Sequence, residues 1–311
     1  MKAAGVTQYG GLEQLRQLEL PTPAIDPENG VLIRVHGAGV GQWDAGIVSG
    51  ASAKTFGRTG FPVIPGVEVA GVVEAVGSQV GEVRPGDEVY TYFFGASGGF
   101  AEYAAAVASE VAPKPKSLSF AQAAALPVAS ITALMAIEET LRVQSGELVL
   151  VAGAAGAVGS LAVQFAKLAG ARVIGTASGA NADYVRGLGA DEFVDYTQGD
   201  VAQQVRGTHP NGVDVGLDTV GGPSVELTAK TVRSGGRFAD ITGTDAKADP
   251  SIQASHVWSE ASRERLIRIG ELVDSGRLRL EIGQLFPLAR ARDALARVTS
   301  RHGRGKVVLE I

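Results

Sequence analysis

Cysteine is absent from this chain of 311 residues. Without thiols it has no disulfide framework, no cysteine nucleophile and no cysteine-ligated zinc. Histidine is scarce as well. The four histidines, His36, His209, His256 and His302, are far apart and form no HxH or HExxH pair. The sequence therefore carries no signal for a metal site, and we expect none.

Clustered positive charge is also missing. The formal net charge is -5, and no basic block is present that would follow a nucleic-acid backbone, so we expect no nucleic-acid partner. The beginning of the chain, MKAAGVTQYGG, lacks the apolar segment of a signal peptide. We therefore expect a cytoplasmic protein with no membrane association.

One long stretch has no charge until its end: LVLVAGAAGAVGSLAVQFAK, from Leu148 to Lys167. Its length would suffice for a membrane span. However, a β-rich start precedes three glycines, Gly153, Gly156 and Gly159. A buried parallel strand, a tight turn and a helix explain this order better than a span.

The organisation along the chain changes near Ser119. Before it, strand patterns such as 31–40 and 69–77 alternate with Gly/Pro turns, which indicates a small barrel-like β domain. After it comes an alanine-rich helical segment, for which Ser119 is a plausible N-cap. Strands and helices then alternate, which predicts a doubly wound parallel sheet. A short helix, PLARARDALARVTS, and a strand, KVVLEI, close the chain.

The glycine-rich turn resembles the dinucleotide fingerprint with alanine first: Ala154, Gly156 and Gly159. A strand that runs into such a turn and then a helix directs backbone N–H groups and the positive helix end at one point, which suits a phosphate. A packing turn in an α/β core is the alternative. We favour the dinucleotide, with contacts from Ala155, Gly156, Ala157 and Val158.

The next strand should end beside the adenosine ribose, where an acid selects NAD. The segment there, GTASGAN (175–181), has no acid, which admits the 2′-phosphate of NADP(H). Ser178 and Asn181 can donate hydrogen bonds to it, and Tyr196 follows the next strand; Ser178 as a helix cap is the alternative. Val220, Ile241 and Thr242 end further strands, where ligands collect.

Taken together, these motifs resemble the medium-chain dehydrogenase/reductase superfamily, in its zinc-independent quinone oxidoreductase (zeta-crystallin-like) branch. The resemblance covers essentially the whole chain and rests on MKAAGVTQYGG, PVIPGVEVAGVVEAVG, RPGDEVY, GGFAEYAAAV, AALPVASITALMAI, AGAAGAVG, GLDTVGG and HGRGKVVLEI. It implies a GroES-like β-barrel catalytic domain at 1–118 and 279–311, and a Rossmann NADP-binding domain at 119–278. It also implies an active site between the domains and a homodimer.

The resemblance also suggests positions for site residues. Val257 would lie near the carboxamide, Arg304 and Lys306 near the cofactor phosphates, and Thr132 near the nicotinamide. Exposed charges, or a threonine bonded to its own backbone, are the alternatives. The candidate substrate-pocket residues are Gln42, Trp43, Tyr92, Phe94 and Thr132. Trp43, Tyr92 and Phe94 have core or surface roles as alternatives, and we expect structural roles for Asp44 and Glu68.

Departures from the family pattern bear on the reaction. In zinc-dependent relatives a cysteine would align with Gly41 and a histidine with Val67, and an asparagine common in quinone reductases also corresponds to Gly41. These differences predict metal-free hydride transfer from NADPH to a quinone or an α,β-unsaturated carbonyl. A reductase for one specialised unsaturated substrate, and a non-catalytic NADP(H)-binding sensor or structural protein, are the alternatives.

Overall fold

The computed structural model describes residues 1–58, 60–95, 98–244, 249–300 and 303–311. Contacts divide the chain into two units, residues 1–128 with 261–311, and residues 129–260. The sequence placed the boundaries after residues 118 and 278. The difference arises because α2 (Phe120–Ala124) packs on strands of the first unit, as does α8 (Arg263–Asp274). The roles assigned to the two domains stay predictions.

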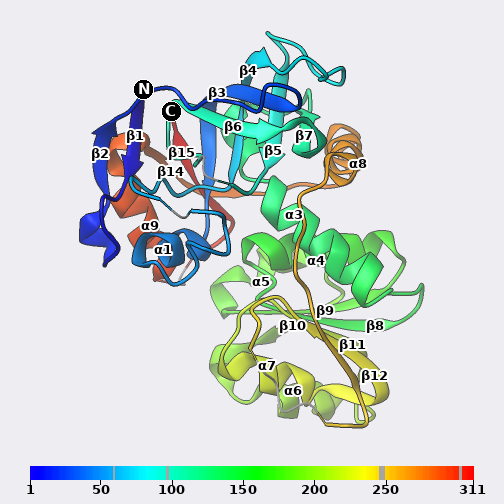
Figure 1. The fold of residues 1–311 in the computed structure, drawn as a ribbon. Coiled ribbons are helices and arrows are strands. Elements are labelled where there is room, and N and C mark those ends of the chain that lie inside the picture. Colours follow the sequence, from blue (N-terminus) through cyan, green and yellow to red (C-terminus); the bar gives the residue numbers. More distant parts are fainter. Residues whose placement is uncertain (59, 96–97, 245–248, 301–302) are drawn as a thin grey trace. The chain divides into compact units, whose positions relative to one another are not determined.

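The first unit is a β domain built from both parts of its chain (Figure 1). Besides α2 and α8, its elements are β1 (Lys2–Gly5), η1 (Leu12–Gln14), β2 (Arg16–Glu19), β3 (Gly30–Val40), α1 (Gln42–Ser49), β4 (Glu68–Val76), β5 (Glu88–Tyr92), β6 (Tyr103–Val107), η2 (Ala108–Glu110), β7 (Val111–Pro113), β14 (Ile282–Pro287), η6 (Leu288–Arg290), α9 (Ala291–Thr299) and β15 (Lys306–Glu310).

Seven strands form its main sheet, in the order β14-β15-β3-β4-β5-β7, with β6 paired to β3. All these pairs are antiparallel except β14 with β15. Along β3 the apolar side chains of Val31, Ile33 and Val35 are buried, while Arg34 between them is exposed. This period of two is the one that predicted the strand. The late strand β15 lies beside the early strand β3, so distant parts of the sequence complete one sheet.

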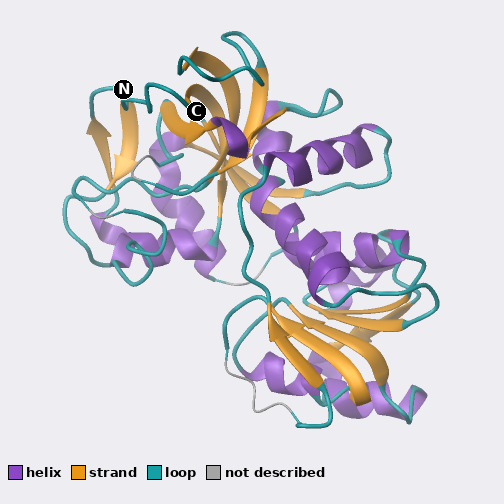
Figure 2. Cartoon of the chain, turned by 45° about the vertical axis from the view of Figure 1, so that its right-hand side comes forward, coloured by secondary structure: helices purple, strands orange, loops and turns teal. Residues whose placement is uncertain are grey.

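The second unit is a parallel sheet with helices on both faces (Figure 2). Its elements are α3 (Pro127–Leu134, which begins in the first unit), η3 (Met135–Thr140), β8 (Leu148–Ala152), α4 (Ala157–Leu168), β9 (Arg172–Ala177), η4 (Gly179–Asn181), α5 (Ala182–Gly187), β10 (Glu192–Asp195), η5 (Tyr196–Gln198), α6 (Val201–Thr208), β11 (Val213–Asp218), α7 (Pro223–Ala229), β12 (Val232–Asp240) and β13 (Gln253–His256).

The strand order in this sheet is β10-β9-β8-β11-β12-β13. It is the order of the doubly wound dinucleotide fold, in which the chain reverses direction across the sheet between its first and fourth strands. Here these are β8 and β11. Leu150, Ile174 and Phe238 lie in the core of this unit. The predicted doubly wound sheet is therefore confirmed.

Two local predictions can be compared directly with the structure. The stretch from Leu148 to Lys167 forms β8, a turn and α4, as expected, and no helix in the described ranges has the length and apolar character to cross a bilayer. The helical segment after Ser119 is divided into α2, α3 and a π-helical turn, η3. Pro127 accounts for the first break, because it disfavours helical backbone at the residue before it. Ser119 caps α2 through the backbone N–H of Gln122.

Candidate functional site

The turn after β8 is shaped by two glycines that no other residue replaces easily. Gly153 has a left-handed backbone, with φ of 75°, a conformation that glycine adopts without strain. A Cβ on Gly159 would lie 2.2 Å from the carbonyl oxygen of Gly153. The third glycine of the fingerprint thus lets α4 approach the end of β8, the packing role that this position has in the dinucleotide fold.

Helix α4 begins at this turn without a side-chain cap. Gly156 is its N-cap residue and offers no side chain to the first N–H groups. Those groups have no partner within the helix, and the helix dipole makes this end positive. Gly156, Ala157 and Val158 are partly exposed. The site therefore fits an anionic group such as a pyrophosphate, which supports the predicted contacts at Ala155, Gly156, Ala157 and Val158 without testing them.

The loop after β9 contains the residues proposed for the 2′-phosphate. Asn181 Nδ2 donates to Ser178 Oγ over 3.0 Å, and the Ser178 side chain does not cap the following turn. The Ser178 hydroxyl therefore does not make the hydrogen bond that the capping alternative requires. Arg186 pairs with Asp183 at 3.9 Å and lies over the ring of Phe193.

Two features of β10 complete this region. Tyr196 follows the strand and is 54% exposed, so its ring is accessible to a ligand. Asp195, at the end of the strand, directs a carboxylate oxygen at Gly179 in the loop after β9. Inspection of that loop alone misses this acid, because it comes from the neighbouring strand. The parallel pairing of β10 with β9 is the signal that would have located it.

Buried aspartates shape the loops at the ends of β11 and β12. Asp218 accepts from the backbone N–H groups of Val220 (2.9 Å) and Gly221 (2.7 Å). Asp240 accepts from the backbone N–H of Thr242 over 2.8 Å. Val220 and Thr242 are exposed and Ile241 is half-buried. The aspartates were missed by the sequence reasoning, although an acid two residues before such a loop is a turn signal.

Val257 and Thr132 are the remaining candidates in the second unit. The backbone N–H of Val257 donates to the Asp240 carbonyl over 2.8 Å, and its side chain is buried. Any polar contact with a carboxamide would therefore use the Val257 carbonyl. Thr132 lies buried in α3. Trp258, next to Val257, is exposed.

In the first unit, the indole of Trp43 explains the glycine at position 41. A Cβ on Gly41 would lie 2.2 Å from two carbons of the Trp43 ring. Any larger residue would have to displace the indole. Gln42, the first residue of α1, is exposed, whereas the Trp43 side chain is only partly accessible. Where the family pattern has an asparagine, this chain thus has a glycine covered by the Trp43 ring.

Asp44 connects α1 to the segment before β4. One carboxylate oxygen accepts from the backbone N–H of Gly41 and the other from that of Gly66, each over 2.8 Å. The side chain is fully buried. Arg58, also buried, donates to the carbonyls of Ile64 and Gly66. Asp44 therefore has the structural role expected for it.

A buried ion pair joins β4 to β15. Lys306 Nζ lies 2.5 Å from Glu68 Oε1, and the exposed fractions of the two side chains are 4% and 0%. The same ammonium lies 4.7 Å from the centre of the Trp43 ring, and Glu68 also accepts from the backbone N–H of Val128. Glu68 is therefore the paired structural carboxylate that we expected.

This pairing bears on the phosphate contacts proposed for the tail. The Lys306 ammonium is engaged inside the first unit, and Arg304 pairs with Glu281 at 2.7 Å. Neither ion pair favours a contact with the cofactor phosphates. Such a contact stays a prediction for Arg304 and Lys306. His302 lies outside the described residues.

An aromatic cluster follows β5. Tyr92 is buried, and its ring centre lies 5.1 Å from that of Phe94. Phe94 in turn stacks on Phe56 at 5.5 Å. The structure brings these two candidates together, with Phe94 partly accessible. Their packing also fits the core alternative.

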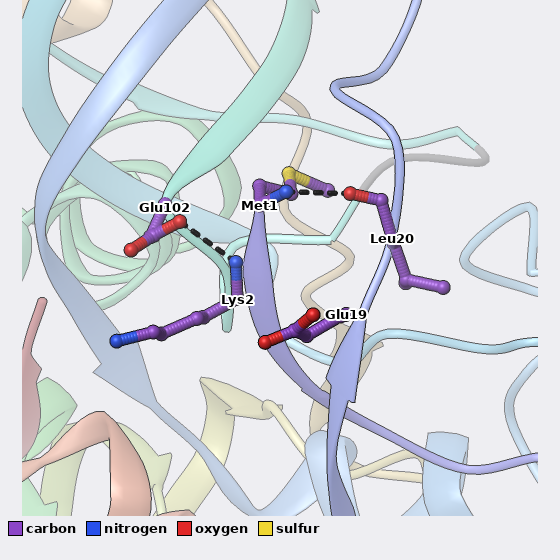
Figure 3. Close-up of a pocket in the computed structure, with 5 residues that line it drawn as sticks. All are labelled: Met1, Lys2, Glu19, Leu20 and Glu102. Carbon is purple, nitrogen blue, oxygen red and sulfur yellow. Dashed lines mark hydrogen bonds between the residues drawn. The ribbon is translucent and has the colours of Figure 1, made fainter.

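A shallow pocket on the first unit lies away from these residues (Figure 3). Met1, Lys2, Glu19, Leu20 and Glu102 line it. The terminal ammonium of Met1 donates to the Leu20 carbonyl, and the backbone N–H of Lys2 donates to Glu102. None of the candidate site residues lines this pocket, so it is not part of the candidate site.

Asp44 should make the stability of the protein depend on pH. Burial raises the pKa of its carboxyl to about 7, against the opposing effect of its two backbone donors. The folded state thus holds a proton that the unfolded chain has released, so the stabilisation is present at low pH and lost as pH rises through about 7. Between pH 5 and pH 8 this group should lower the free energy of unfolding by about 3 kcal/mol.

Urea unfolding at pH 5 and pH 8 would measure this effect, with Asp44→Asn as the comparison. Asparagine cannot titrate, so the stability of the variant should change less between the two pH values. Glu68 and Glu110, whose pKa values burial also raises, titrate in both proteins and cancel in the difference. Equal pH dependence in the two proteins would contradict the prediction.

Comparison with known sequence families gives two matches. Residues 27–116 match the family described as the alcohol dehydrogenase GroES-like domain, and residues 188–309 match the family described as zinc-binding dehydrogenase. The first match lies in the β domain. The second spans most of the parallel sheet and continues into the tail, so both units have known relatives.

Individual relatives are similar over nearly the whole chain. A chloroplastic NADPH-dependent alkenal/one oxidoreductase of Arabidopsis thaliana is 33% identical, over 99% of this chain and 79% of the relative. A quinone oxidoreductase of Mus musculus is 31% identical, over 98% of this chain and 96% of the relative. The solved quinone oxidoreductase of Coxiella burnetii has a TM-score of 0.92 and 32% identity, covering 100% of this chain and 99% of that one.

Proposed function

This chain belongs to the medium-chain dehydrogenase/reductase superfamily, and from that premise we propose that it is an NADPH-dependent oxidoreductase that reduces quinones or α,β-unsaturated carbonyls. The observation that carries the proposal is the uncapped start of α4 at Gly156, beside a turn in which Gly153 and Gly159 admit no larger residue without strain. The relatives named for quinone and alkenal reduction supply the substrate class.

We propose further that the reaction uses no zinc, although the description of one matching family mentions it. The residues at the metal positions do not fit a metal: Gly41 has no donor and is covered by Trp43, and Val67 is a buried hydrocarbon. The chain has no cysteine to replace them. We therefore derive no step through a metal.

The bound cofactor would supply a hydride to the acceptor. The chain's own residues would bind and orient the reactants. The N–H groups at the start of α4 would hold the pyrophosphate. The loops shaped by Asp218 and Asp240 would fix the position of the nicotinamide half through Val220, Ile241 and Thr242. On the first unit, Trp43, Tyr92 and Phe94 would offer apolar contacts that exclude water from a flat acceptor, and Gln42 would offer a hydrogen-bond donor.

Turnover with a panel of acceptors tests this function. NADPH oxidation should be measured with benzoquinones, naphthoquinones, short enals and enones, with simple alcohols and NADP⁺ as controls. We expect reduction of quinones or enones, no alcohol oxidation and no loss of activity after prolonged incubation with a chelator. Activity that disappears with the chelator and returns with Zn²⁺ would refute the zinc-free proposal.

A reductase for one specialised unsaturated substrate is the second candidate. The observation that favours it is the Trp43 ring packed on Gly41. The family pattern has a polar asparagine at this position, and here an aromatic ring covers a glycine. Selective turnover of one acceptor in the panel would favour this alternative, and tight NADPH binding without any turnover would favour the non-catalytic one. The homodimer and the cytoplasmic location stay predictions.

A further inference from the structure

The end of β10 brings a carboxylate to the loop after β9. The two strands are parallel neighbours, and their register pairs Asp195 with Ala177, the last residue of β9. Asp195 Oδ2 lies 2.6 Å from the position of a Cβ built on Gly179. The absence of a side chain at Gly179 is what permits this approach. The loop without an acid of its own therefore has one from its neighbour.

The carboxylate is fixed in place and ionised. Its other oxygen, Oδ1, accepts from Thr197 Oγ1 (2.7 Å) and from the Thr197 backbone N–H (2.9 Å). These two hydrogen bonds, that of the hydroxyl first, lower the pKa of Asp195, with a smaller contribution from the backbone N–H of Gly179. Asp195 therefore carries a full negative charge at neutral pH.

The loop after β9 carries no positive charge of its own, because residues 175–181 contain no lysine or arginine. Arg186, in α5 beyond the loop, pairs with Asp183 and lies over Phe193. A ligand group near Ser178 and Asn181 would thus meet the Asp195 charge with no cation of the loop to offset it.

We propose that Asp195 determines cofactor preference, by accepting a hydrogen bond from the adenosine ribose of NADH and by repelling the 2′-phosphate of NADPH. The inference rests on the proposed function and refines it. In this fold the ribose lies at the carboxyl end of the second strand, which here is β9. An acid beside that strand end acts on the 2′-position as an acid in the loop would. Asp195 therefore lowers the preference for NADPH over NADH that a loop without an acid would give.

The variant Asp195→Asn isolates the charge. Asparagine keeps an oxygen that accepts from Thr197, so the turn after β10 is retained. Asp200→Asn is the matched control, because it removes one charge from the segment after β10, where Asp200 caps α6 through the backbone N–H of Gln203 and asparagine caps equally well. Both variants have the same net charge.

Calorimetric binding of 2′,5′-ADP and 5′-AMP reports on the 2′-phosphate and needs no acceptor or turnover. We expect Asp195→Asn to bind 2′,5′-ADP about tenfold more tightly, the effect of removing one carboxylate several ångströms from a phosphate dianion in a largely solvated site. Its affinity for 5′-AMP should fall, because the amide nitrogen that replaces Oδ2 cannot accept a hydrogen bond from the ribose hydroxyl. Asp200→Asn should match the wild type, and the gain in Asp195→Asn should shrink at high salt.

The outcomes separate this inference from the function on which it rests. Unchanged 2′,5′-ADP affinity in Asp195→Asn, or an equal gain in Asp200→Asn, overturns the role of Asp195 and leaves the proposed function standing. If wild-type protein binds neither nucleotide, the proposed cofactor is wrong and the inference is overturned with it.

Discussion

Replacing Gly156 with aspartate should leave the protein folded and abolish dinucleotide binding. Gly156 has φ of -76° and ψ of 173°, an extended conformation that any residue adopts. Aspartate is a good N-cap residue, so stability should change by no more than about 0.5 kcal/mol relative to glycine. The new carboxylate would occupy the donors that the pyrophosphate needs and would repel it. We expect NADPH affinity to fall at least about 100-fold.

Gly156→Asn is the matched control for this experiment. Asparagine has the same size and also caps helices, but it has no charge. A Cβ at position 156 would lie 3.3 Å from the Gly153 carbonyl oxygen, so both variants require the same small adjustment. Fluorescence titration with NADPH and urea unfolding should be measured for both. Retained NADPH binding in the aspartate variant would show that the start of α4 is not part of the binding site.

Removing the cation of the buried ion pair should produce the largest loss of stability. In Lys306→Met the Glu68 carboxylate keeps one backbone donor and loses its counterion, while methionine still packs against Trp43. Breaking a buried pair in this way costs about 3–5 kcal/mol. The deficit should shrink toward acidic pH, because protonation of Glu68 removes the buried charge. Urea unfolding at pH 5 and pH 8 would measure both effects.

The double variant Glu68→Gln/Lys306→Met is the control. Glutamine still accepts from the Val128 N–H, and no charge remains buried, so most of the lost stability should return. Equal stabilities of the single and double variants would mean that the uncompensated charge is not the cause. Cofactor binding by the double variant would also test whether Lys306 contacts a phosphate.

Local patterns predicted most of the fold. The alternation in β3, the cap at Ser119 and the order strand, glycine turn, helix at β8 and α4 each depend on residues a few positions apart. Such signals survive folding because the backbone enforces them locally. The prediction for the helical segment after Ser119 was less accurate, because the alanine-rich periodicity conceals the break before Pro127.

The candidate site was predictable only where one segment carries it. The N–H donors at the start of α4 follow from the turn itself. Asp195 and Lys306 could not be evaluated in the same way, because their partners, Gly179 and Glu68, come from other strands. The register of a sheet cannot be read from a short stretch of sequence. It nevertheless decides whether a charge outside a loop in the sequence lies beside that loop in space.

The position of β15 between β14 and β3 has a consequence for synthesis. The second unit is one continuous segment and can fold as soon as it has emerged from the ribosome, since domains generally fold as units during translation. The sheet of the first unit must wait, because β15 is made only after the whole second unit. Until then Glu68 has no cation, and the edge of β3 that β15 will cover remains open to other strands. The nascent chain therefore passes through a period in which the second unit can be folded while the sheet of the first unit is incomplete.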